Sequence, residues 1–305
     1  MRNAFIDELV KLAGAHEHIA LVVGDLGYSV VEPFADIFPD RFINAGVAEQ
    51  NMMGLAAGMA SEGYHVFTYS IANFPTFRCA EQIRNDIDYH NLPVTVVAVG
   101  GGVAYGALGY SHHAVQDYAL MRTLPNMLIA APGDPMEVRA CMRYVVENPQ
   151  PSYLRLGKAG DPIFHPSPPV VEPGHWLMVS PGAHGTRDKA LLTTGATLAL
   201  AIEWQGSAMY RDHSVFSLPL WGMKAKSHQA SMLPPWSEVV TLEDHLTEAG
   251  FGSWLMESTP PHAGLRERLR SVALDSCVCG TVGTQDTLNK LGGLRLKAIQ
   301  PTELN

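Results

Sequence analysis

The sequence has few cysteines, an excess of acidic over basic side chains, and no uninterrupted apolar run that would suit a membrane span. Its four cysteines lack zinc-site spacing and its first residues carry no apolar signal-peptide core, so we expect a reduced, cytoplasmic protein. The formal net charge of −9 disfavours a nucleic-acid surface, which would need basic groups. The apolar tract 92–109 is interrupted by a proline and glycines, which predicts a buried strand and a glycine-rich loop, with no membrane role.

The remaining composition is that of a globular protein with one large or two ordinary domains. The chain has 305 residues, of which 47% are apolar and 17% charged. Its first half alternates apolar strand-like runs with amphipathic segments, which predicts a parallel sheet covered by helices on both faces. The expected helices are 3–14, 49–62, 74–90, 114–122 and 135–147, and the expected strands are 20–23, 41–44, 65–69, 94–99, 127–130 and 152–155.

A change in composition separates this half from the rest of the chain. Residues 161–173 are rich in proline and lack a regular period, which indicates a linker. Alternation then resumes, with strands expected at 190–193, 214–218 and 238–242 and helices at 197–209 and from about 250. We therefore expect an α/β protein with two doubly wound, mainly parallel domains, over 1–160 and 188–305, joined by a linker over 161–187.

Glu49 is the first residue with candidate chemistry. It lies where the expected strand 41–44 gives way to a helix, and the spacing of Gly54 and Gly58 suggests that this helix packs closely on a neighbour. A carboxylate buried at such a point has a raised pKa unless it is paired, which would let it donate a proton to a ring nitrogen. The alternative is an ordinary first-turn acid that the helix dipole stabilises.

Aromatic and histidine side chains follow at two further loops. Phe74 and Phe77 are spaced to share a helix face, where they could pack in the core or stack on a flat heterocycle. His112 and His113 lie in a glycine-rich loop without the spacing of a metal site. His112 suits proton transfer, although a surface histidine is the alternative.

Together these segments resemble the C-terminal half of transketolase, namely its pyrimidine-binding domain followed by its C-terminal domain. The resemblance covers essentially the whole chain, and it depends on the order and spacing of several short motifs. These motifs are Gly-Asp-Leu at 24–26, Gly-Val-Ala-Glu-Gln-Asn at 46–51, Ser-His at 111–112, Leu-Pro-Asn-Met at 124–127, Thr-Leu-Glu-Asp-His at 241–245 and Gly-Phe-Gly at 250–252.

The resemblance implies a thiamine diphosphate enzyme of carbohydrate metabolism. Glu49 would protonate the aminopyrimidine ring of the cofactor, and either Phe74 or Phe77 would stack on that ring. His112 would assist proton transfers at the substrate oxygens, and Asp25 would line the thiazolium side.

One family motif is missing. The family holds the diphosphate through Mg²⁺ bound by a Gly-Asp-Gly sequence and a later asparagine, and this chain contains no Gly-Asp-Gly. The resemblance therefore implies one subunit of a split enzyme, whose companion subunit carries the diphosphate domain and the metal. A heterotetramer of two chains of each kind is the expected assembly.

The substrate positions match the family only in part. Arg2 and Ser29 match residues that bind the phosphate group of a sugar phosphate, and Lys158 stands where a further arginine is expected. Gly100 replaces a histidine, and Leu108 replaces the aspartate that hydrogen-bonds to a sugar hydroxyl. Since losing such a partner changes selectivity, we expect a modified sugar that is deoxygenated, branched or carries another anion.

Two other functions remain open on the sequence. One is a decarboxylating relative, such as a deoxyxylulose-phosphate synthase or the beta subunit of a 2-oxo acid dehydrogenase. Residues 92–94 and 152–155 slightly favour this alternative. The other is a noncatalytic scaffold subunit. Retention of Glu49, both phenylalanines and His112 argues against the scaffold.

Overall fold

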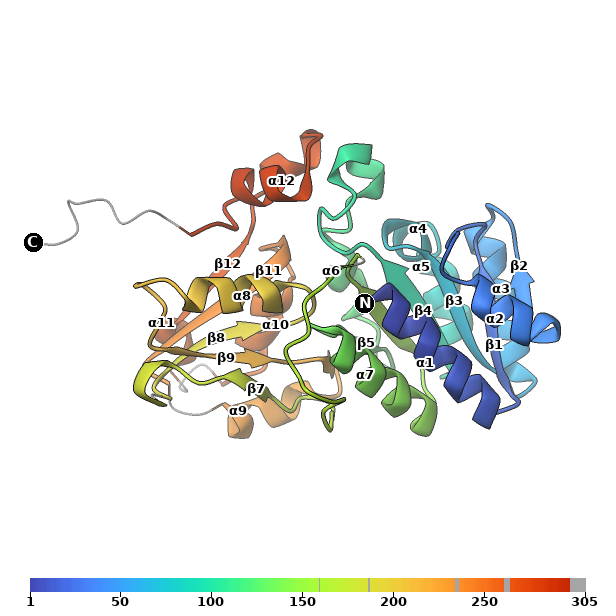
Figure 1. The fold of residues 1–305 in the computed structure, drawn as a ribbon, viewed down its shortest axis with the longest axis horizontal. Coiled ribbons are helices and arrows are strands. Elements are labelled where there is room, and N and C mark those ends of the chain that lie inside the picture. Colours follow the sequence, from blue (N-terminus) through green and yellow to red (C-terminus); the bar gives the residue numbers. More distant parts are fainter. Residues whose placement is uncertain (159, 186, 234–235, 261–263, 297–305) are drawn as a thin grey trace, which may run out of the picture.

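Two sheets, each covered by helices, form the two halves of the molecule (Figure 1). The computed structural model describes residues 1–158, 160–185, 187–233, 236–260 and 264–296. The final segment of the expected second domain, 297–305, lies outside the described residues. Within the described ranges, no helix combines the length and the apolar character needed to cross a bilayer.

The first sheet has seven strands in the order β10-β5-β6-β4-β3-β1-β2, and all neighbours are parallel except β10 and β5. Most of its central strands are buried along their whole length, as strands covered on both faces must be. The strands are β1 (Ile19–Val23), β2 (Phe42–Asn44), β3 (His65–Ile71), β4 (Val94–Val99), β5 (Leu128–Ala130), β6 (Ser152–Leu156) and β10 (Leu220–Gly222).

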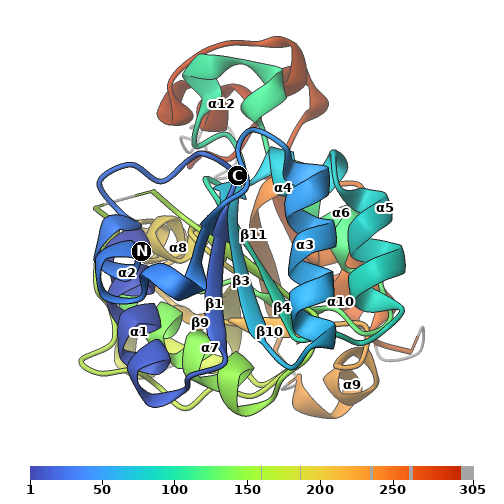
Figure 2. The same ribbon diagram turned by 90° about the vertical axis from the view of Figure 1, so that its right-hand side faces the viewer.

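Helices cover both faces of this sheet (Figure 2). One face carries α1 (Arg2–Ala15), α2 (Glu32–Ile37) and α7 (Pro135–Glu147), and the other carries α3 (Glu49–Ser61), α4 (Asn73–Phe77), α5 (Ala80–Gln82) and α6 (Asp117–Met121). The start of α7 follows directly from its sequence, because the Asp134 carboxylate accepts hydrogen bonds from two first-turn amides and a proline follows it.

The second sheet has the order β12-β11-β8-β9-β7 and is parallel except for β7. Its strands are β7 (Leu177–Ser180), β8 (Lys189–Thr193), β9 (His213–Ser217), β11 (Glu238–Leu246) and β12 (Leu269–Leu274). Alternate residues pack in two separate apolar clusters, with Leu191 against α8 (Thr197–Gln205) and Leu192 in the cluster of α10 (Phe251–Glu257). The second half is therefore also doubly wound. The remaining helices are α9 (Gln229–Met232), α11 (Leu265–Arg268) and α12 (Gln285–Leu291).

Strand β10 joins the two halves, because it lies between β9 and β11 in the sequence yet pairs with β5 of the first sheet. Trp221 in this strand is fully buried, and its ring contacts Tyr118 of α6 and Phe251 and Trp254 of α10. One apolar cluster therefore continues from the first half into the second.

Several expected elements differ from the structure, and some of its elements were not predicted. The helix expected over 74–90 is divided into α4, α5 and a π-helical segment Ile83–Asp88, because Cys79 leaves helical geometry at φ −111 and ψ 14. Strand β7 lies inside the expected linker, so the second sheet begins before residue 188. Helix α2, which begins at a Glu-Pro pair, was not predicted. Helices α6 and α8 are shorter than the expected 114–122 and 197–209.

Candidate active site

The candidate site lies at the carboxyl edge of the first sheet. In the sheet, β2 lies on one side of β1 and β3 lies on the other. The loop after β1 therefore leads towards β2, the loop after β3 leads towards β4, and the two loops diverge. Crevices at such switch points bind ligands in open α/β sheets. Gly24 follows β1, and a Cβ on it would lie 3.6 Å from Glu49 Cγ and 3.7 Å from Ser70 Oγ. The absence of a side chain at residue 24 therefore leaves room beside the Glu49 carboxylate.

Glu49 is the first residue of α3 and is 2% exposed, as the sequence predicted. Its Oε2 accepts a hydrogen bond of 2.6 Å from Nη1 of Arg78, whose side chain is 46% exposed. The buried acid is therefore paired, and the N-terminus of α3 adds a favourable dipole. Arg78 was not among the predicted site residues, although its place four residues after Phe74 is the spacing at which two side chains meet on a helix.

The two phenylalanines have different surroundings. The Phe74 ring has the Arg78 guanidinium 4.7 Å above its centroid and the His112 ring edge-on at 5.0 Å. Phe77 is 49% exposed. The structure thus brings Glu49, Arg78, Phe74 and His112 together in one chain of contacts.

His112 ends the 3₁₀ turn Tyr110–His112, and α4 holds this turn through the Asn73 side-chain amide, which donates to the Ser111 carbonyl at 2.8 Å. The Nδ1 atom of His112 lies 3.0 Å from Ser111 Oγ. Partial burial lowers the pKa of His112, and the neighbouring His113 lowers it further. The neutral ring, which can accept a proton, is therefore favoured at neutral pH.

Asp25 and Ser29 lie on the loop after β1, and both adopt positive φ, at 55° and 61°. The Asp25 carboxylate accepts a hydrogen bond of 2.9 Å from the Asn44 amide, and Asn44 Oδ1 accepts from the backbone N–H of Gly46 at 2.9 Å. Asn44 therefore ties this loop to the segment that leads into Glu49. Ser29 is exposed, and its N–H donates to Glu32.

Arg2 is the first residue of α1, on the face of the first sheet opposite α3, and Lys158 follows β6. Burial lowers the pKa of Lys158, and the positive charge of Arg2 lowers it further. Burial raises the pKa of Tyr69 to about 12, and the positive charge of Arg2 opposes that shift. Neither cation forms an ion pair with a carboxylate among the described residues, and Arg2 Nε is buried without a hydrogen-bond partner there.

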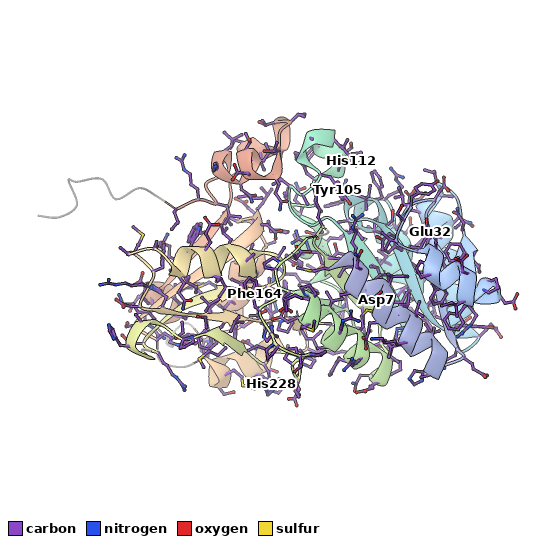
Figure 3. The ribbon with its side chains drawn as sticks, viewed as in Figure 1. Asp7, Glu32, Tyr105, His112, Phe164 and His228 are labelled. Atoms are coloured by element: carbon purple, nitrogen blue, oxygen red, sulfur yellow. The ribbon has the colours of Figure 1, made fainter. Side chains whose placement is uncertain are left out.

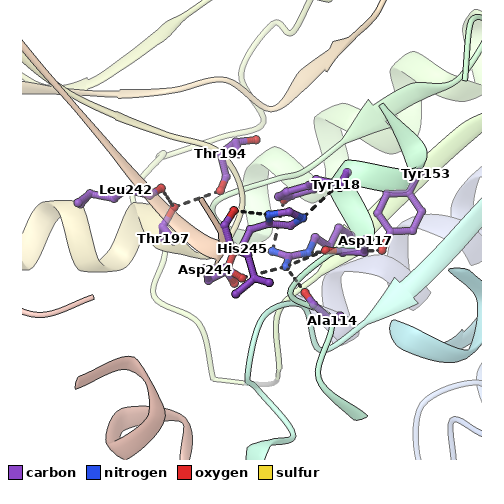
Figure 4. Close-up of polar contacts among 12 residues, drawn as sticks. Ala114, Asp117, Tyr118, Tyr153, Thr194, Thr197, Leu242, Asp244 and His245 are labelled. Carbon is purple, nitrogen blue, oxygen red and sulfur yellow. Dashed lines mark hydrogen bonds and ion pairs between the residues drawn. The ribbon is translucent and has the colours of Figure 1, made fainter. Parts of the chain in front are cut away.

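The loop that carries His112 is anchored at both ends by Arg155 of β6. Figure 4 shows the polar contacts of Ala114, Asp117 and Asp244. The guanidinium donates to the Ala114 carbonyl at 2.9 Å and contacts Gly101, on which a Cβ would lie 2.3 Å from Arg155 Cζ. Figure 3 shows the loop above the carboxyl edge of the first sheet, with Tyr105 and His112 both on it.

The arrangement fits half of a binding site for an aminopyrimidine. A buried carboxylate at a helix N-terminus can hold a ring nitrogen, and an exposed phenylalanine can cover a flat ring. The part of the chain that the structure describes contains no cluster of three or more carboxylate, histidine or cysteine side chains that could hold a metal ion.

This chain is similar to known proteins along most of its length. Residues 1–160 match the transketolase pyrimidine-binding domain family. A protein of Methanocaldococcus jannaschii described as a transketolase C-terminal section is 31% identical, over 96% of this chain and 92% of its own length. One subunit of the apulose-4-phosphate transketolase of Phocaeicola vulgatus is 32% identical, over 84% and 82%. A split-gene transketolase solved as an inactive β4 tetramer has a TM-score of 0.78 at 30% identity, over 96% and 93%.

Proposed function

Since this chain belongs to the transketolase family, we propose that it is one subunit of a split, thiamine-diphosphate-dependent transketolase. The assembled enzyme would move a two-carbon ketol unit from a ketose to an aldose. The observation that carries the proposal is the buried Glu49 carboxylate at the N-terminus of α3, connected through Arg78 and Phe74 to His112.

The chain's own residues would hold and orient the reactants. Glu49 would hydrogen-bond the aminopyrimidine nitrogen, and Phe77, with its ring exposed, would stack on that heterocycle. Phe74 would keep Arg78 and His112 in place through its two ring contacts. His112 would exchange a proton with a substrate oxygen, and Asp25 would line the thiazolium side. Bound thiamine diphosphate supplies the carbon nucleophile for the transfer.

A companion subunit would complete the site. This sequence has no Gly-Asp-Gly, so the diphosphate and Mg²⁺ would be held by the companion. The relatives of matching length include one subunit of an apulose-4-phosphate transketolase, which supports a separate partner chain. We propose a heterotetramer with two copies of each chain, in the cytoplasm, where the four free cysteines would stay reduced.

The substrate would be a modified sugar phosphate. Arg2 and Lys158 would supply two positive charges to a terminal phosphate, and Ser29 would add a hydroxyl from the loop after β1. Leu108 stands where the family has an aspartate that hydrogen-bonds to a sugar hydroxyl. It is 58% exposed, and its side chain can form no hydrogen bond. The similarity to a subunit of an apulose-4-phosphate transketolase points in the same direction.

The test begins with affinity purification of this chain from its native lysate and identification of a co-purifying chain that contains Gly-Asp-Gly. The complex is then assayed with ketose phosphates as donors and aldehydes as acceptors, and in parallel with pyruvate in place of the ketose. Turnover of ketoses supports the proposal. Turnover of pyruvate alone would replace it with the decarboxylating function, and a complex that binds no thiamine diphosphate would indicate a noncatalytic subunit.

A further inference from the structure

Tyr105 occupies the space that a side chain at residue 100 would need. Gly100 has φ +84, and a Cβ placed on it would lie 2.1 Å from Cε2 and 2.4 Å from Cδ2 of the Tyr105 ring. These distances are far below van der Waals contact, so a ring from residue 105 and a side chain at residue 100 exclude each other. The position at which the family resemblance leads one to expect a histidine is thus filled by a tyrosine five residues further along the loop.

The surroundings of this ring are cationic. Lys158 Nζ lies 5.1 Å from the ring centroid, within the range of a cation–π contact. Burial raises the pKa of Tyr69, the positive charge of Arg2 opposes that shift, and Tyr105 adds to it. Tyr105 therefore contacts Lys158 directly and lies, like Arg2, in the surroundings of Tyr69. Neither cation has a carboxylate partner among the residues described.

A phenol in this place changes what the anion site can recognise. It offers a single O–H donor in place of the two ring nitrogens of an imidazole. Its ring also fills the crevice beside Gly100 with an apolar face. The hydrogen-bond donors around an incoming anion would then be one phenol hydroxyl and two cationic side chains.

We propose that Tyr105 determines specificity for the terminal phosphate of the substrate, donating its hydroxyl to an anion that Arg2 and Lys158 neutralise. The inference rests on the proposed function, because it takes the Arg2–Lys158 pair as part of the substrate site. The resemblance to the family shows only that residue 100 has lost a side chain. The inference adds Tyr105 as the residue that takes the place of that side chain.

The first measurement is equilibrium binding of inorganic phosphate to the full chain, followed by phosphorus NMR. The variants are Tyr105→Phe, which removes only the hydroxyl, and Lys158→Met, which removes one cation. Tyr64→Phe is the matched control, because Tyr64 is an exposed tyrosine at the opposite edge of the sheet, just before β3. We expect the first two to raise the Kd by about tenfold each, the size of one hydrogen bond to a charged group, and the control to leave it unchanged.

The second measurement uses the assembled enzyme with D-xylulose 5-phosphate and D-xylulose, which differ only in the phosphate. Tyr105→Phe should raise KM for the phosphorylated sugar by about tenfold, leaving its kcat and both constants for D-xylulose unchanged. A merely structural role of Tyr105 would affect both sugars alike and would overturn the inference.

The two proposals fail in different ways. If Lys158→Met weakens phosphate binding and Tyr105→Phe does not, the role of Tyr105 is wrong and the substrate site stands. If wild-type chain binds no phosphate, or neither variant changes its Kd, the anion site is wrong and the inference about Tyr105 falls with it. The transferase function itself is tested separately, through Glu49.

Discussion

Arg155 of β6 and Asp244 of β11 form a buried ion pair, 2.6 Å between Nη1 and Oδ1, that joins the two sheets. The same guanidinium binds Asp117 of α6 through Nε at 2.6 Å, so one cation serves a carboxylate from each half of the molecule (Figure 4). Asp244 also lies against Gly102, on which a Cβ would be 2.8 Å from Oδ2. The second half therefore supports the base of the loop that carries Tyr105 and His112.

Removing this carboxylate should destabilise the protein. In Asp244→Asn, the buried guanidinium loses one of its two anions, and we expect the free energy of unfolding to fall by about 3 kcal/mol. The measurement is urea denaturation. Asp286→Asn is the control, because Asp286 forms an exposed pair with Lys290 that contributes less than about 0.5 kcal/mol. Equal stability of the Asp244 variant and the control would show that the interdomain pair contributes nothing.

Replacing Glu49 tests the proposed reaction. Glu49→Gln keeps the shape of the side chain but removes the acid, so kcat of the assembled enzyme should fall at least about 100-fold. Glu62→Gln is the matched control, because Glu62 is exposed and lies just beyond the other end of α3. Assembly with the companion should be unchanged in both variants. Full activity of Glu49→Gln would eliminate the proposed role of this carboxylate.

The two phenylalanines should separate cofactor binding from stability. Phe77→Leu removes an exposed ring, so it should weaken thiamine diphosphate binding about tenfold without changing the free energy of unfolding. Phe74→Leu removes the ring between Arg78 and His112 and should cost about 1 kcal/mol of stability. The measurements are a cofactor titration of the assembled enzyme and denaturation of this chain. The reverse pattern would assign the stacking ring to Phe74.

The sequence predicted those elements whose signal is local. Strand Val94–Val99 is confirmed over its full length, because its run of mostly β-branched residues between a proline and a glycine has few other interpretations. The start of α3 at a buried Glu49 is confirmed as well, because helix spacing and small residues are both visible in the sequence. The role of Glu49 stays a prediction.

The features that the sequence did not predict depend on how distant segments meet. Strand β10 is three residues long and is defined only by its pairing with β5. Arg78 and Tyr105 gain their meaning from the side chains beside them, Glu49 for one and Lys158 for the other. The division of the expected helix 74–90 follows from backbone geometry at Cys79, a residue with no helix-breaking character of its own.

Glu243 of β11 should make stability depend on pH. Burial raises its pKa from 4.5 to about 7, against hydrogen bonds from Gly252, Thr241 and Phe251 that favour the ionised form. The unfolded chain therefore loses this proton near pH 4.5 while the folded chain keeps it, so stability falls as pH rises from about 4.5 to 7, by up to about 3 kcal/mol.

Denaturation at several pH values should show that Glu243→Gln removes this part of the decline. Glu137, whose pKa burial also raises to about 7, contributes in the same direction and remains in the variant. Glu248→Gln, at an exposed position, is the control. If the Glu243 variant and wild type differed by the same amount at pH 5 and pH 8, Glu243 would be ionised in the folded protein throughout.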